Sequence, residues 1–187
     1  MNESAERALK VYMETALEGA TDTKGNPIEV PVMIGFPEVE WISKHIPCVV
    51  FRVDGFSEIG DYIPNGLPLY TGQETVESKI PAAWLVGYVL MRARINIVTR
   101  ERSLLDRLTM KLIEKVLTMP YFSYGEYEET QDYQIESQSG DDSEPVPDEK
   151  PQSRIFERVL TWTVRGPLIL TSEEYPVEEF IPRLEVE

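Results

Sequence analysis

The stretch "RARINIVTRERSLLDRLTMKLIEKVL", residues 92–117, predicts a β-strand that runs almost directly into an amphipathic helix. In its first part apolar and polar residues alternate, which is typical of a strand with one buried face. In its second part apolar residues recur every three or four positions and form one stripe, made by Leu104, Leu105, Leu108, Leu112, Val116 and Leu117. Thr99 or Ser103 is the expected N-cap of this helix, and Pro120 is its expected end. A strand followed at once by a helix that folds back on the same sheet indicates an α+β layer.

The alternation extends upstream to residue 84 and predicts one long strand with two different faces. The first face is expected to be core throughout and carries Leu85, Val89, Met91, Ala93, Ile95 and Ile97. The second face is apolar at its beginning and polar at its end, in the order Trp84, Val86, Tyr88, Leu90, Arg92, Arg94 and Asn96. We therefore expect the apolar beginning of the second face to contact another chain and its polar end to meet water.

A second helix and three further strands complete the predicted layer. An apolar helical stripe near the N-terminus consists of Ala5, Ala8, Leu9, Tyr12, Met13, Ala16 and Leu17, with Ser4 as the expected N-cap and Gly19 as the terminator. Residues 28–34 alternate, and Pro31 places that strand at a sheet edge or a bend, because proline has no backbone donor. The stretches "CVVFRVDGF" and "RIFERVLTWTVRG" predict the other two strands.

These elements predict a single α+β domain over residues 1–166, a small mixed or antiparallel sheet with two amphipathic helices packed on it. Repeated prolines and glycines in residues 57–81 predict an extended excursion with a hairpin. Residues 126–153 are strongly acidic and predict a flexible insertion. Residues 167–187 contain three prolines and predict an extended C-terminal arm, with apolar anchors at Tyr175, Phe180 and Ile181.

The net charge of −15 argues against ordinary nucleic-acid binding, which needs basic faces to neutralise phosphates. Such a charge serves solubility, or it coats a passage through which DNA slides without sticking. Cys48 is the only cysteine, so it forms no disulfide within the chain. The longest apolar run, "AAWLVGYVLM", is about half of a membrane helix, and no secretion signal precedes it. We expect a soluble protein that is intracellular when made.

No catalytic, cofactor-binding or metal-binding residue is predicted. His45 is the only histidine, so any histidine-based triad or metal site would rest on that position. Cys48 lies three residues away, but it begins an apolar strand, which favours a buried, inert thiol. Nucleotide, phosphate, zinc and calcium motifs are absent from the sequence. Carboxylates are so numerous that their presence decides nothing.

One basic cluster stands out, formed by Arg92, Arg94, Arg100, Arg102, Arg107 and Lys111. Contact with phosphate is one interpretation. Pairing with carboxylates is favoured, either within the chain or across a subunit contact, because 33 acidic side chains are present and arginine suits planar carboxylate pairing.

The order of the elements resembles that of tail terminators and related tail-completion (neck) proteins of tailed bacteriophages. The resemblance covers about residues 1–170. It is carried by the N-terminal helix, the "IPCVVFRV" strand, the strand "VGYVLMRARINIVT" feeding into "RERSLLDRLTMKLIEKVL", the acidic insertion and the late "ERVLTWTVRGPL" strand. Residues 57–81 and 126–153 depart from the simplest members, which leaves open a tail terminator, a head-closure protein or another neck component.

The resemblance implies a virion structural protein of the tail or neck, assembled in the host cytoplasm, and no enzyme. It implies a hexameric ring that caps the tail tube and joins it to the head-side connector. Expected partners are further copies of the chain, the tube protein, the connector and the sheath, while DNA passes through the lumen without specific binding. The predicted subunit interface consists of Trp84, Val86, Tyr88, Leu90, Arg92, Arg94, Tyr175, Phe180 and Ile181.

Two other classes of function stay open at this point. The first is an acidic adaptor or inhibitor that mimics DNA or occupies a basic partner. The second is an enzyme that uses carboxylates alone.

Overall fold

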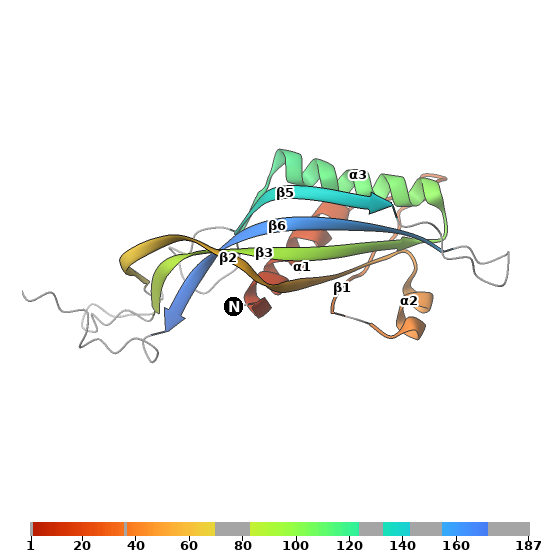
Figure 1. Cartoon of the computed structure of the whole chain (residues 1–187). Helices are drawn as coiled ribbons and strands as arrows, with labels where there is room; N and C mark the ends of the chain where they lie inside the picture. Colours follow the sequence, from red (N-terminus) through yellow and green to blue (C-terminus); the bar gives the residue numbers. More distant parts are fainter. Residues whose placement is uncertain (1, 36, 70–82, 124–132, 143–154, 172–187) are drawn as a thin grey trace, which may run out of the picture.

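A computed structural model describes residues 2–35, 37–69, 83–123, 133–142 and 155–171 (Figure 1). Within these ranges the chain forms the helices α1 (Asn2–Leu17), α2 (Val39–His45) and α3 (Arg102–Thr118). The strands are β1 (Val32–Ile34), β2 (Cys48–Leu69), β3 (Ala83–Thr99), β4 (Tyr121–Phe122), β5 (Tyr133–Asp142) and β6 (Phe156–Thr171).

The strands form one mixed sheet in the order β1-β2-β3-β6-β5-β4. The β1–β2 pair is parallel, and the other pairs are antiparallel. Beyond the helices, β2, β3 and β6 continue together and curl at one end of the sheet (Figure 1). The strand predicted over residues 28–34 is limited to the three-residue β1, because residues 28–31 form no strand. β1 follows Pro31 directly and lies at the sheet edge, one of the two places expected for this proline. The coarse prediction of an α+β fold with helices packed on a mixed sheet therefore holds.

The main core lies between the sheet and the two long helices. Helix α1 contacts β1, β2 and β4, whereas α3 contacts β3 and β6. The sheet side of this core includes Phe51, Met91, Ile95, Ile97 and Trp162, each of which is nearly or fully buried. Burying such side chains contributes roughly 1.5–3 kcal/mol each, so this one-sided layer accounts for most of the apolar stabilisation.

Residues 92–117 form the predicted strand and helix, with two corrections. Leu104, Leu105, Leu108, Leu112 and Val116 are buried in the core, but Leu117 is 74% exposed because it lies beyond the buried stripe. The N-cap of α3 is Glu101, and neither Thr99 nor Ser103 takes that position. Thr99 is the buried last residue of β3, and its hydroxyl donates to the Glu101 carbonyl at 2.8 Å.

Helix α1 buries its predicted stripe, with Ala16 only partly covered. It begins at Asn2, so Ser4 lies inside the helix rather than at its N-cap. Gly19 follows the helix with a φ of 66°, and the Ala20 amide donates to the Leu17 carbonyl at 3.0 Å. Glycine adopts such a left-handed conformation without steric cost, so the predicted terminator is confirmed.

Three segments predicted as loop or arm belong in part to the sheet. Residues 57–69 of the predicted excursion continue β2. The register of β2 against β3 shifts between Tyr62 and Leu67, and Gly66 lies within this irregular stretch with a φ of 61°. Residues 133–142 of the predicted flexible insertion form β5, which pairs with β6. Residues 167–171 of the predicted arm are the end of β6. The remaining parts of these predictions, including Tyr175, Phe180 and Ile181, lie outside the described residues.

Candidate interaction surface

The sheet face opposite α1 and α3 carries rows of polar side chains. In antiparallel strands, residues directly opposite each other project on the same side. One row consists of Asp54, Arg92, Thr163 and Ser137. The next row consists of Arg52, Arg94, Thr161 and Ser139. We call these eight residues the arginine face.

Two arginines of this face have no bonding partner within the part of the chain that the structure describes. Arg92 and Arg94 are exposed, and neither takes part in a hydrogen bond or ion pair there. Arg52 differs, because its Nε lies 2.8 Å from Asp54 Oδ1. Asp54 is the residue opposite Arg92 and the one acidic residue among the eight, and it is already paired with Arg52. Arg92 and Arg94 are thus available to carboxylates from outside the described sheet.

One end of the arginine face is bounded by a small apolar cluster at the curled end of the sheet. Buried Leu69, Ala83 and Leu85 pack there with the partly buried side chains of Ile63, Tyr88 and Ile169. The guanidinium carbon of Arg165 lies 4.2 Å from the centroid of the Tyr88 ring, a cation–π contact. The arginine face is therefore followed at this end by a largely buried aromatic and apolar cluster.

The other end is bounded by α2. Buried Cys48, Val50 and Val98 project on the same side as the arginines and pack against Trp41, Ile42, Ile46 and Ile155. Figure 1 places α2 at one end of the sheet and the curled strands at the other. The arginine face thus lies between two apolar clusters, on the side that the two long helices do not cover.

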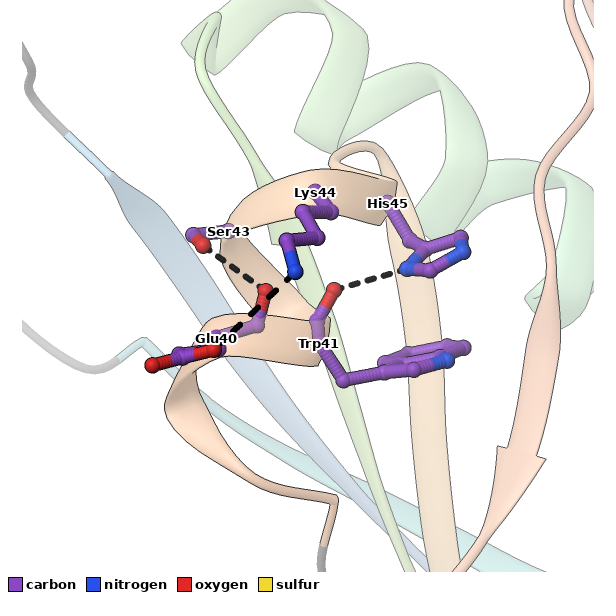
Figure 2. Close-up of polar contacts among 5 residues, drawn as sticks. All are labelled: Glu40, Trp41, Ser43, Lys44 and His45. Atoms are coloured by element: carbon purple, nitrogen blue, oxygen red, sulfur yellow. Dashed lines mark hydrogen bonds and ion pairs between the residues drawn. The ribbon is translucent and has the colours of Figure 1, made fainter.

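Helix α2 holds the single histidine in a structural arrangement, as Figure 2 shows. The His45 ring stacks on Trp41 at a centroid distance of 4.3 Å, and its Nδ1 lies 2.8 Å from the Trp41 carbonyl. A carbonyl only accepts, so this contact requires the tautomer that carries its proton on Nδ1. The same turn is held by Ser43, whose hydroxyl donates to the Glu40 carbonyl at 2.9 Å, and by a 3.9 Å ion pair between Lys44 and Glu40.

Cys48 follows the expectation of a buried thiol. Its side chain is fully buried, and burial raises its pKa from 9.0 to about 11. A thiol with a raised pKa is protonated at neutral pH and is a weak nucleophile. A Cys48–His45 catalytic pair therefore receives no support from the geometry.

The predicted interface residues of β3 do not all share one face. Tyr88, Leu90, Arg92 and Arg94 follow the alternation and project together on the side of the arginine face. A register shift against β6 between Leu85 and Gly87 interrupts the alternation, so that Leu85 clusters with Tyr88 instead of Val89. Upstream of that shift, Trp84 is half-buried and Val86 is buried. A bulge of this kind leaves no trace in the hydrophobic pattern, and the sequence alone could not locate it.

The predicted basic cluster is divided between two sides of the sheet. Arg107 donates to the Asp22 carbonyl at 2.9 Å, and Lys111 donates to the Glu18 carbonyl at 3.1 Å, so both tie α3 to the segment after α1. Arg100 reaches the Ser43 carbonyl at 3.4 Å. Only Arg92 and Arg94 reach the arginine face, because they belong to the strand and the others follow it.

Within the described ranges, no group of three or more histidine, cysteine or carboxylate side chains is placed to hold a metal ion. No helix there has the length and apolar character needed to cross a membrane. No protein-family model matches the chain, and no curated protein matches it significantly.

Proposed function

We propose that this chain is a virion structural protein, a tail terminator subunit that forms a hexameric ring, caps the tail tube and joins it to the head-side connector. The observation that supports this most is the arginine face. Arg92 and Arg94 are exposed and unpaired in the described sheet, although acidic residues outnumber basic ones by 33 to 18. In so acidic a chain, two arginines that pair with no carboxylate of the described sheet indicate that the arginine face binds a partner. They argue against a face that only contacts solvent.

The arginine face offers side-chain contacts that the two long helices leave uncovered. The short edge strands β1 and β4 pair with only three residues of β2 and two of β5, so we argue the subunit contact from this face and not from the sheet edges. Helices α1 and α3 already cover one face. A subunit contact would then use the arginine face and the adjoining Tyr88 and Leu90. In a head-to-tail contact, each copy is rotated by the same angle relative to its neighbour. The copies form a closed ring when these rotations return to the first copy.

The charge suits a ring through which DNA passes. A net charge of −15 for each copy repels phosphates, so an acidic lumen would let DNA slide without binding. In this proposal the chain acts by its shape and its contacts, without catalytic chemistry.

Native mass spectrometry and negative-stain imaging of the purified chain test the proposal, alone and after addition of tube protein. Six-fold rings in either sample are expected. Rings that form only with the connector would favour a head-closure or other neck protein instead. A chain that stays monomeric with both partners would overturn the ring proposal.

A second candidate is an acidic adaptor that occupies a basic partner. The net charge of −15 and a pI near 4.5 favour it, because such a surface attracts basic proteins over long distances at low salt. A strict monomer that binds a basic partner tightly would support this candidate, whereas rings in the absence of such a partner would not.

A further inference from the structure

Charge is unevenly divided along the chain. Residues 70–82, 124–132, 143–154 and 172–187 carry 15 of the 33 acidic side chains but only 4 of the 18 basic ones. Most of the net charge of −15 therefore resides in these segments, and the described ranges are close to balanced. The arginine face is thus a basic site on a nearly neutral domain, in a molecule that supplies its own excess of carboxylates.

The C-terminal segment 172–187 has the composition that the arginine face would select. It contains six glutamates and one arginine, together with Tyr175, Phe180 and Ile181. The arginine face has the opposite charge and also carries apolar side chains, because Arg92 and Arg94 lie next to the half-buried Tyr88 and Leu90. Carboxylates pair with guanidinium groups by charge-assisted hydrogen bonds, and aromatic side chains add contact area.

The spacing also matches. Arg92 and Arg94 are two residues apart on one strand, so their attachment points lie about 6.6 Å apart. Glu185 and Glu187 have the same separation in sequence and would match it in an extended chain. Pro176 and Pro182 lack a backbone donor and favour extended backbone over helix.

We propose that residues 172–187 of one copy bind across the arginine face of a second copy, with glutamates on Arg92 and Arg94. A second copy is favoured over the same chain by the direction of β6. Thr163 and Thr161, which lie opposite the two arginines, come eight and ten residues before Thr171. The chain's own segment would have to reverse at Thr171 and run back about 27 Å along the strand it had just left.

This inference rests on the proposed self-association and identifies the residues through which neighbouring copies would bind. Each copy would then donate a segment and accept one, and a ring forms when the donor and the acceptor of each copy belong to different neighbours. Because exposed ion pairs are screened by salt, the contact should weaken as ionic strength rises.

Photocrosslinking in the full-length chain tests the contact. Phe180 is replaced by the photoreactive analogue p-benzoylphenylalanine, and ¹⁵N-labelled copies are mixed with unlabelled copies before irradiation. The expected product joins residue 180 of one isotope to a β3 or β6 peptide around Arg92 or Thr163 of the other. Cross-links confined to a single isotope, or mapping to α1 or α3, would overturn the proposal.

A pair of charge variants gives the second readout. Arg92→Gln with Arg94→Gln should lower the mixed-isotope yield about tenfold, as the loss of roughly 1.4 kcal/mol of binding predicts. Lys24→Gln with Arg102→Gln removes the same charge from exposed positions outside the arginine face and should leave the yield unchanged. Equal losses in both variants would point to net charge alone and would contradict the proposal.

Two further outcomes separate this inference from the proposed ring. Mixed-isotope cross-links at the arginine face without any ring would leave the contact standing and overturn the ring. Rings whose cross-links map to other parts of the chain would support the ring and overturn the proposed contact. A duplex DNA fragment added as competitor should not reduce the yield at 150 mM salt. Displacement of the segment by that DNA would identify the arginine face as a nucleic-acid site and overturn the proposal.

Discussion

The hydroxyl of Tyr12 in α1 donates a 2.7 Å hydrogen bond to the backbone carbonyl of Met119, the C-cap residue of α3. The Tyr12 ring also lies 5.0 Å from Phe122 and 6.1 Å from Trp162, measured between ring centroids. A single side chain thus links both long helices to the sheet. These contacts lie on the helix-covered side of the sheet, opposite the arginine face.

Tyr12→Phe should therefore lower the free energy of unfolding by about 0.5–1.5 kcal/mol. It keeps the ring contacts but removes the part-buried hydrogen bond to the Met119 carbonyl, and a typical intramolecular hydrogen bond contributes about this much. Urea denaturation at neutral pH measures the change. Tyr62→Phe is the matched control, because Tyr62 is 68% exposed and should be nearly neutral. Equal effects of the two changes would show that the hydrogen bond is not the cause.

Tyr12 should also make the protein sensitive to alkali. Burial raises its pKa from 10.0 to about 12. Between these values the unfolded chain loses the proton that the folded chain keeps, so stability falls as pH rises. At pH 11 we expect a loss of about 1 kcal/mol from this group. The raised pKa of Cys48 acts in the same direction from about pH 9 to 11.

The Tyr12→Phe variant isolates the tyrosine's share of this effect. It lacks the phenol but retains Cys48, so its stability should fall less steeply than that of the parent above pH 10. Urea denaturation at pH 8, 10 and 11 gives the two curves. Curves that stay parallel across this range would contradict the assignment.

Gly166 marks the tightest packing in β6. A Cβ at this position would lie 2.6 Å from Met91 Cε and 2.7 Å from Tyr133 Cε1, closer than such atoms approach in proteins. Gly166→Ala should destabilise the fold by about 1–3 kcal/mol, as expected for overpacking a core. Thermal unfolding measures this. Gly55→Ala meets nothing within 4 Å and is the control, expected to change stability by less than about 0.5 kcal/mol.

Helices α1 and α3 could be predicted from the sequence, whereas β5 could not. The stripes of α1 and α3 are local, since every third or fourth residue meets the same core. The stretch 133–142, "YQIESQSGDD", has the composition of a loop, and only Tyr133 and Ile135 enter the core. Its strand is held by backbone pairing with β6, whose paired residues lie 16 to 31 positions further along the chain. Such pairing depends on tertiary context, which composition does not contain.

The arginine face was predictable only in part. The alternation along β3 correctly predicts that Arg92 and Arg94 point away from the core and are exposed. Which neighbours share their row depends on the register with β2 and β6, and no short motif specifies that register. The sequence therefore indicates two exposed arginines, but not that Asp54 is already paired with Arg52 beside them.

Two deletions test the pairing of β5. Removing residues 137–150 takes away Ser137–Asp142, which pair with Arg158–Thr163, and should cost about 2–4 kcal/mol through lost ladder hydrogen bonds. Removing only residues 143–150 shortens a connection and should change stability by about 1 kcal/mol or less. Differential scanning calorimetry compares both with the parent chain. If the longer deletion proved as mild as the shorter one, β5 would contribute nothing to stability.

Removal of residues 172–187 should weaken self-association but leave the stability of the folded domain nearly unchanged. The buried core that the structure describes lies wholly before residue 172, so the midpoint of urea unfolding should change little. Self-association should weaken at least about tenfold, because the arginine face would lose its carboxylate partners. Sedimentation velocity over a concentration series at low salt measures the association. A truncated chain that assembles as before but melts earlier would place the segment on its own domain instead of on a neighbouring copy.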